Sequence, residues 1–243
     1  MRRIRNIALG ALGGLCLTAC ATAPVADGAP DLNDPLERAN RRVFELSLAI
    51  DKSVTRPAAV AYRDVVPVNV REMIRNFLNN LNSPSVFAND VLQGEVDRAR
   101  VTLVRTVVNT GVGAGGIFEV AEGWGFPGHY EDFGQTLAVW GVGEGPYLVI
   151  PLIGPSNPRD LAGRGVDFFL DPLVYVEWGD DAYLPYARTG TDVLDLRARN
   201  IETLDDIERT SADFYASVRS LYRQARNNEI RNGAAEVEDL PDF

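Results

Sequence analysis

The chain has 243 residues, with 24 Lys and Arg against 34 Asp and Glu, so its formal net charge is −10 at pH 7. This acidic balance argues against a nucleic-acid-binding protein, because phosphate groups would repel it, and it disfavours attachment to anionic lipid through a basic patch. The length is enough for one large domain or two small ones, and we expect one.

The first 19 residues form a predicted signal peptide. Three arginines at positions 2, 3 and 5 precede an apolar run over 7–19, which is shorter than the roughly 20 residues of a membrane-spanning helix. That run ends in Leu17-Thr18-Ala19-Cys20, which is similar to the processing site of bacterial lipoproteins. The similarity implies a mature chain that begins at Cys20, with a diacylglyceryl thioether on its sulfur and a fatty acid on its amino group. The alternative is an ordinary export signal with an incidental cysteine.

Lipidation at Cys20 predicts a firm membrane anchor, since each buried methylene contributes about 0.8 kcal/mol. Ala21 follows the cysteine in place of an aspartate, which is similar to outer-membrane sorting in enteric bacteria. Cys16 would leave with the signal peptide, so the mature chain would have no free thiol, disulfide or cysteine metal ligand. Loss of the three leader arginines would bring the formal charge to −13.

Residues 20–32 have small side chains and two prolines, so we expect a flexible tether from the acylated cysteine. A single helical domain is predicted over 33–232. Its first helix is expected from Pro35 to about Val54, because Asp34-Pro35-Leu36-Glu37 has the pattern of a capping box with proline at the first helical position.

Three more helices are predicted from apolar residues at helical spacing. The first runs from Pro67 or Val68 to Leu81 and is expected to stop at Ser83-Pro84. A short helix over 84–92 and another over 95–108 follow.

The middle of the chain, 111–165, has a different composition. It holds 14 of the 22 glycines, and between Leu137 and Ile153 the only charged residue is Glu144. Glycines and prolines interrupt this stretch, so a simple transmembrane span is not expected. The composition fits short broken helices or a hairpin in or near a bilayer, and it fits a buried glycine-rich hairpin equally well.

One long amphipathic helix is predicted from Thr191 or Asp192 to about Ala225. Asp205 and Asp206 are expected on its solvated face and not as an acid/base pair. The tail over 233–243 is acidic and is predicted to be disordered.

Two features could indicate a binding or catalytic site, and we interpret both as structural. Residues 111–116 match G-x-G-x-x-G, but they follow a helical pattern and not a strand, which favours a hinge or close backbone packing over dinucleotide binding. His129 is the only histidine, and no nucleophile motif accompanies it, so we expect neither catalysis nor metal binding there. Trp124, Trp140 and the nearby aromatic residues fit either an interfacial belt or a core.

Several motifs, in order and spacing, resemble the VacJ/MlaA family of outer-membrane lipoproteins over about 33–172. The motifs are Asn33-Asp34-Pro35-Leu36-Glu37 with Asn40-Arg41, Asn76-Phe77-Leu78-Asn79-Asn80-Leu81 with Pro84, Leu92-Gln93-Gly94, Asp132-Phe133-Gly134-Gln135-Thr136-Leu137, Trp140-Gly141, Gly145-Pro146-Tyr147-Leu148-Val149-Ile150-Pro151-Leu152, Gly154-Pro155-Ser156 and Arg159-Asp160. Ala138 departs from the pattern, because the family often has glycine there.

The resemblance implies an all-α fold, a ring of amphipathic helices seated in the periplasmic leaflet of the outer membrane, with a polar channel for phospholipid headgroups. It implies no catalytic residue, cofactor or metal. The protein would remove phospholipids misplaced in the outer leaflet, beside a trimeric porin, and pass them to a soluble periplasmic carrier.

We predict which segments of the chain carry out this role. The helix face with Val70, Ile74, Phe77 and Leu78 is predicted to contact lipid, and the glycine-broken segment over 111–147 is predicted to flex as a gate. The hinge candidates are Gly111, Gly113, Gly116, Gly141 and Gly143. Two alternatives stay open: a structural lipoprotein that tethers the envelope without transport, and a periplasmic hydrolase, for which no nucleophile and base arrangement is recognisable.

Overall fold

The computed structural model describes residues 33–175 and 184–234. The predicted signal peptide and tether lie outside the described residues, as does the tail beyond 234, so these three segments stay predictions. The described elements are α1 (Glu37–Ile50), the π-helix η1 (Asp51–Thr55), α2 (Arg56–Val65), α3 (Val68–Gln93), α4 (Val96–Gly111), α5 (Val120–Gly123), α6 (Phe133–Val139), β1 (Leu148–Ile150), β2 (Gly154–Ser156), α7 (Pro158–Leu170), the 3₁₀-helix η2 (Pro172–Tyr175), α8 (Leu184–Arg199), α9 (Ile201–Thr210) and α10 (Phe214–Ile230).

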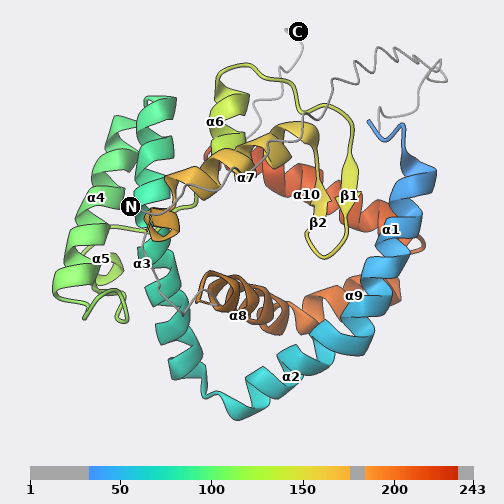
Figure 1. Ribbon diagram of the computed structural model, residues 1–243, viewed down its shortest axis with the longest axis horizontal. Coiled ribbons are helices and arrows are strands. Elements are labelled where there is room, and N and C mark those ends of the chain that lie inside the picture. Colours follow the sequence, from blue (N-terminus) through green and yellow to red (C-terminus); the bar gives the residue numbers. More distant parts are fainter. Residues whose placement is uncertain (1–32, 176–183, 235–243) are drawn as a thin grey trace, which may run out of the picture. The chain divides into compact units, whose positions relative to one another are not determined.

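Contacts between these elements form a closed circuit (Figure 1). The first half runs from α1 through η1 to α2, which packs against α8, and α8 packs against α3. The second half runs from α3 to α6 and α7, from α6 to α10, and from α10 through β2 and β1 back to α1. The predicted all-α class with a ring-like arrangement of helices is therefore confirmed for this domain.

The two strands form an antiparallel hairpin inside the glycine-rich middle. Val149 pairs with Pro155, and its side chain is buried. Leu152 and Ile153, at the tip, are exposed to 70% and 52%. Both structural expectations for this stretch are met in part, since it contains short helices as well as a hairpin with two buried residues, Val149 and Ser156, and an apolar exposed tip.

The predicted capping box at the start of α1 is wrong. The residue at the N-cap position is Leu36, and no side chain caps the helix. Asp34 instead accepts hydrogen bonds from Asn40, Tyr215 and Arg219. Because its carboxylate is 1% exposed and paired with a guanidinium, it joins two helices and does not cap one.

The predicted stop at Ser83-Pro84 is also wrong. The helix α3 runs through Pro84 without a break and has 26 residues in all. Proline inside a helix costs about 3 kcal/mol, so other contacts must offset it. The turns after Pro84 supply them: Asn89 donates to Asp167 at 3.0 Å, and Thr136 donates to Asn89 at 2.8 Å. The helix ends at Gly94, whose φ of 81° is the left-handed conformation typical of a helix end.

The single long helix predicted near the C-terminus is three helices. Asn200 separates α8 from α9, and residues 211–213 separate α9 from α10. Asp213 begins α10 by accepting a hydrogen bond from the backbone N–H of Ala216. The apolar period continued across both breaks, so it could not reveal them.

Many polar side chains of this domain are buried, and many large hydrophobic side chains are exposed. Among the described residues, the largest fully buried side chains are Gln135, Glu131, Asn89, Asn157, Thr136, Asp90 and Ser156, all of them polar. Large hydrophobic side chains are exposed, including Leu103 and Val107 on α4 and Phe168 and Phe169 on α7. Such extended apolar surface marks an interaction with lipid or protein. No described helix combines the length and the apolar character that a bilayer span requires.

Candidate functional site

A cavity of about 1030 Å³ lies between α1, η1, α2, the hairpin, α8, α9 and α10. This volume is at the upper end of the range for ligand pockets. Its apolar lining residues are Phe44, Leu48, Val149, Leu152, Ile153, Val193, Leu196, Leu204, Phe214 and Val218. The cavity therefore offers an extended apolar wall to an occupant.

Charged side chains also line the cavity. These six residues, which we call the charged wall, are Asp51, Lys52, Arg56, Arg197, Asp205 and Glu208. Asp51, Arg197, Asp205 and Arg56 form a chain of ion pairs between η1–α2 and α8–α9, and Lys52 and Glu208 form a separate pair. A cavity lined by both apolar and ion-paired side chains suits an amphiphilic occupant.

Four ion-pair contacts organise the charged wall. Arg197 binds both oxygens of Asp51, at 2.8 and 2.9 Å, and its Nη2 lies 3.8 Å from Asp205. The Arg56 guanidinium binds Asp205 at 2.6 and 3.2 Å and holds the pKa of that carboxyl below its ordinary value. The remaining pair joins Lys52 to Glu208 at 2.5 Å.

The π-helix η1 positions Asp51 and Lys52 of the charged wall. A π-turn inserts an extra residue into a helix, and such turns are frequent at functional sites. Asp51, Lys52 and Thr55, all within η1, line the cavity. Sequence reasoning missed this element because the surrounding residues continue an ordinary helical pattern.

Two polar atoms at the cavity have no hydrogen-bond partner among the described residues. They are Nη1 of Arg197 and Oγ of Ser47, and both atoms are buried. A buried polar group without a partner costs free energy, and both atoms are shielded from the open volume of the cavity. The Arg197 side chain is 10% exposed and is fixed by Asp51.

The family-type motif at the start of the domain builds a framework beside the cavity. Asn40 donates to Asp34 at 2.8 Å and to the carbonyl of Tyr147 at 3.0 Å, and its amide oxygen accepts from the N–H of Val149. Asn33 donates to the carbonyl of Gly145. The motif residues at 33–41 and 145–147 are thus brought together, and they hold the hairpin against α1.

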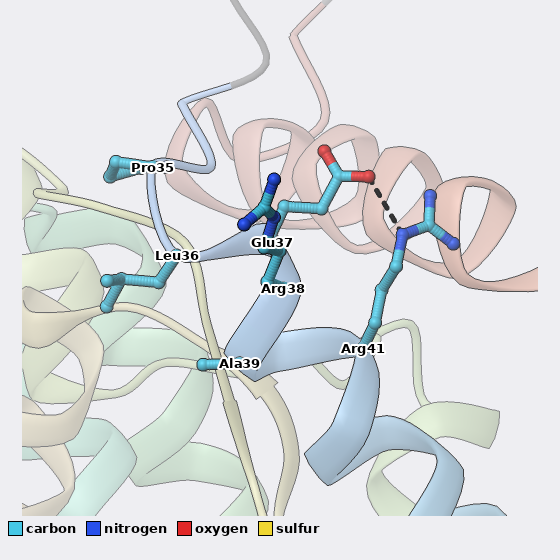
Figure 2. Close-up of a pocket in the computed structure, with 6 residues that line it drawn as sticks. All are labelled: Pro35, Leu36, Glu37, Arg38, Ala39 and Arg41. Carbon is cyan, nitrogen blue, oxygen red and sulfur yellow. Dashed lines mark hydrogen bonds and ion pairs between the residues drawn. The ribbon is translucent and has the colours of Figure 1, made fainter.

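A second hollow, about 620 Å³, lies at the first turn of α1 and is lined by Pro35, Leu36, Glu37, Arg38, Ala39 and Arg41. Figure 2 shows Glu37 reaching to Arg41, with Pro35 and Leu36 directed away from that pair. The Arg41 Nε donates to Glu37 at 2.8 Å, and its other nitrogens bind Asp213 at the start of α10. These contacts tie α1 to α10, so the hollow belongs to the framework.

We expect the Asp213 pair to make stability depend on pH in acid. The hydrogen bond from Arg41 lowers the pKa of Asp213 to about 2, below the value of about 3.9 in an unfolded chain. A lowered folded-state pKa stabilises the fold above about pH 4, and this contribution is lost as the pH falls towards 2. Asp213→Asn keeps a good N-cap, so its cost in urea unfolding should shrink as the pH falls from 6 to 2.5. Asp206→Asn, in an exposed pair, is the control and should show no such trend.

The second framework centres on Asp132, Asp160 and Arg226. Both carboxylate oxygens of Asp132 accept from Arg226, each at 2.8 Å, and Arg226 also donates to Asp160 at 2.9 Å. Burial alone would raise the pKa of Asp160, but hydrogen bonds from Arg226 and Tyr222 lower it. Asp132 also caps α6 by accepting from the N–H of Gln135. The motif at 132–136 therefore joins α6, α7 and α10.

The remaining residues of this motif are packing residues. Gly134 meets Gly163 where α6 crosses α7: a Cβ on Gly163 would lie 2.3 Å from the Gly134 nitrogen. Phe133 stacks edge-on with Trp140, with ring centroids 5.6 Å apart. Thr136 is fully buried and bonds Asn89. None of these side chains lines the large cavity.

The predicted hinge glycines have two kinds of surroundings. Added Cβ atoms on Gly113 and Gly116 would lie 2.3 Å from the Phe118 carbonyl and 2.4 Å from the Asn80 side chain. Close backbone packing, one of the two interpretations of residues 111–116, thus describes these two positions. Gly111, Gly141 and Gly143 face open space. Their role as hinges stays a prediction.

His129 has a structural environment. Its Nε2 lies 2.9 Å from Asp90 and 3.2 Å from Thr102, and Thr102 donates to Asp90 at 2.6 Å. Since one ring nitrogen faces both partners, the three residues do not form a nucleophile–base–acid relay. The described residues contain no group of three or more His, Cys, Asp or Glu side chains placed to hold a metal.

The aromatic residues divide between the two predicted roles. Trp124, Tyr130 and Trp140 are more than half exposed, as an interfacial belt requires, whereas Tyr147 is buried against Tyr215. The expectation that Asp205 lies on a purely solvated face is wrong. It pairs across elements with Arg56, which sequence spacing alone could not show, because the two residues are 149 positions apart.

The comparisons with known proteins point to one family. The model of the MlaA lipoprotein family matches residues 32–229. The intermembrane phospholipid transport system lipoprotein MlaA of Escherichia coli is 34% identical, over 92% of this chain and 87% of that protein. Its Haemophilus influenzae namesake is 30% identical, over 99% and 97%. An uncharacterised protein of Rickettsia felis is 31% identical, over 84% and 81%.

A solved structure agrees with the computed fold. It comes from work on the structural basis for maintenance of bacterial outer membrane lipid asymmetry, and it superposes with a TM-score of 0.74 at 32% identity. The match covers 81% of this chain and 98% of that one.

Proposed function

Because the chain belongs to the MlaA lipoprotein family, we propose that it removes mislocalised phospholipids from the outer leaflet of an outer membrane and passes them to a soluble periplasmic carrier. The names of its Escherichia coli and Haemophilus influenzae relatives, which are lipoproteins of an intermembrane phospholipid transport system, support this role.

The cavity lined by both apolar side chains and the charged wall is the observation that carries the proposal. A phospholipid that leaves a bilayer must move a charged headgroup through hydrocarbon, which is costly because charges lose their hydration. Ionised side chains inside an apolar shell lower that barrier, while the acyl chains keep apolar neighbours. The closed circuit of helices provides this combination around the cavity.

The exposed hydrophobic side chains support a position of the domain within lipid. We propose that the exposed hydrophobic side chains of α3, α4 and α7 contact acyl chains in the periplasmic leaflet, and that acylated Cys20 adds the anchor. Val70 and Phe77, both predicted to contact lipid, are 41% and 40% exposed. A trimeric porin beside the protein and a soluble carrier below it complete the proposed pathway.

Filling the cavity should block transport. Val193 lines the cavity and is 43% exposed, so Val193→Trp would occupy space there without burying a new group in a packed core. Val107→Trp, on α4 and away from the cavity, is the matched control. A strain lacking the protein would be complemented with each variant, the wild type and Cys20→Ala. Lipid A palmitoylation and detergent sensitivity would report surface phospholipid.

We expect surface phospholipid to stay high with Val193→Trp and Cys20→Ala and to return to normal with the wild type and Val107→Trp. Equal rescue by both tryptophan variants would argue against passage through the cavity. Unchanged surface phospholipid on loss of the protein, together with a mechanically weakened envelope, would instead indicate the structural tethering role.

A further inference from the structure

We propose that the charged wall selects zwitterionic headgroups, which carry a phosphate beside an ammonium group, over headgroups with a net negative charge. The inference rests on the proposed transport function and adds a substrate preference to it. The observation behind it is the charge balance of the wall.

The wall is neutral as a whole although it is fully ionised. Three cationic side chains, Lys52, Arg56 and Arg197, face three carboxylates, and each cation lies within ion-pair distance of a carboxylate. An anionic headgroup would therefore meet no net positive charge to offset its lost hydration. A zwitterionic headgroup brings no net charge, so the neutral wall does not penalise it.

The alternation of sign along the wall also matches a zwitterion. Arg197 lies between Asp51 and Asp205, at 2.8 and 3.8 Å, so a cation and two carboxylates occupy adjacent positions. A headgroup phosphate can bind a guanidinium while its ammonium binds the neighbouring carboxylate, and the number of ion pairs is kept. An anionic headgroup would displace a carboxylate and leave it without a cation.

Accessibility differs along the wall in a way that favours exchange of partners. The Lys52 and Glu208 side chains are 52% and 35% exposed, Arg56 and Asp205 are 40% and 38% exposed, and Arg197 and Asp51 are 10% and 25% exposed. The outer pairs are open enough to exchange partners with a headgroup. At the inner pair, both oxygens of Asp51 hold Arg197 as a fixed cation.

Two variants of one ion pair provide the test. Lys52→Gln and Glu208→Gln break the same exposed contact, so any loss of stability should be similar, but they change the wall's net charge in opposite directions. Each full-length lipidated protein would be purified from membranes containing phosphatidylethanolamine and phosphatidylglycerol. Mass spectrometry would give the ratio of the two lipids bound, relative to their ratio in the membrane.

The wild type should be enriched in phosphatidylethanolamine. Glu208→Gln should shift the bound ratio about two- to fivefold towards phosphatidylglycerol, and Lys52→Gln by a similar factor the other way, while the double variant returns to the wild-type ratio. Bound lipid at the membrane ratio in every variant would overturn the selectivity but leave transport standing. Absence of phospholipid from all preparations, the wild type included, would overturn both.

Discussion

Gly163→Ala is expected to destabilise the domain by about 3 kcal/mol and to lower its melting temperature by about 10 °C. The new Cβ would lie 2.3 Å from the backbone nitrogen of Gly134 and 2.7 Å from its Cα. Backbone atoms cannot rotate away as a flexible side chain does, so α6 and α7 would have to separate. Their separation would also strain the contacts of Asp132 and Asp160 with Arg226.

Gly165→Ala, two residues along the same helix, is the control. Nothing lies within 4 Å of a Cβ at that position, and glycine inside a helix costs about 1 kcal/mol relative to alanine. This variant should be as stable as the wild type or slightly more so in thermal unfolding followed by circular dichroism. Similar melting temperatures for the two variants would show that the helix crossing tolerates a methyl group.

Arg226→Met should cost about 3 kcal/mol, because it leaves Asp132 without its cation and Asp160 with only Arg159 as an ion-pair partner. The Arg226 side chain is 8% exposed and binds Asp132, Asp160 and Glu229. Methionine has nearly the length of arginine, so the expected loss comes mainly from unpaired charge. Without the guanidinium, burial should raise the pKa of Asp160, so this variant should lose less stability at pH 5 than at pH 8.

Arg209→Met tests whether the loss is specific to a buried network. Arg209 pairs with Asp206 on one exposed helix face, where side chains are 75% and 64% exposed. Such pairs contribute about 0–1 kcal/mol, so urea unfolding should barely change. If both arginine variants were equally stable, the Arg226 network would be no more than a surface feature.

The fold class was predictable because most helices carry a local signal. The apolar period from Val96 to Val107 gave α4 within a few residues, and the end predicted at 92 lies one residue from the end of α3. The wrong predictions share a cause. Pro84 and Asp34 have strong local preferences that tertiary contacts override. The contacts are those of Asp167 and Thr136 with Asn89 after Pro84, and that of Arg219 with Asp34. These three partners are all distant in sequence.

The site was less predictable than the fold, for a physical reason. The recognisable motifs, such as those around Asp132 and Tyr147, build the framework of the helices, where buried polar groups demand particular partners. The charged wall consists of ordinary surface-type residues on amphipathic helices, and only the closing of the circuit turns Arg197 and Asp205 towards one cavity. No local pattern distinguishes them from a solvated helix face.

The position of Arg219 and Arg226 in the last described helix has a consequence for biosynthesis. The arginine that pairs with Asp34 lies 185 residues later in the chain, and the one that pairs with Asp132 lies 94 residues later. These buried carboxylates therefore cannot be paired until nearly the whole chain has been made. A chain that ends before residue 219 would keep its acidic groups unpaired and become a substrate for proteases.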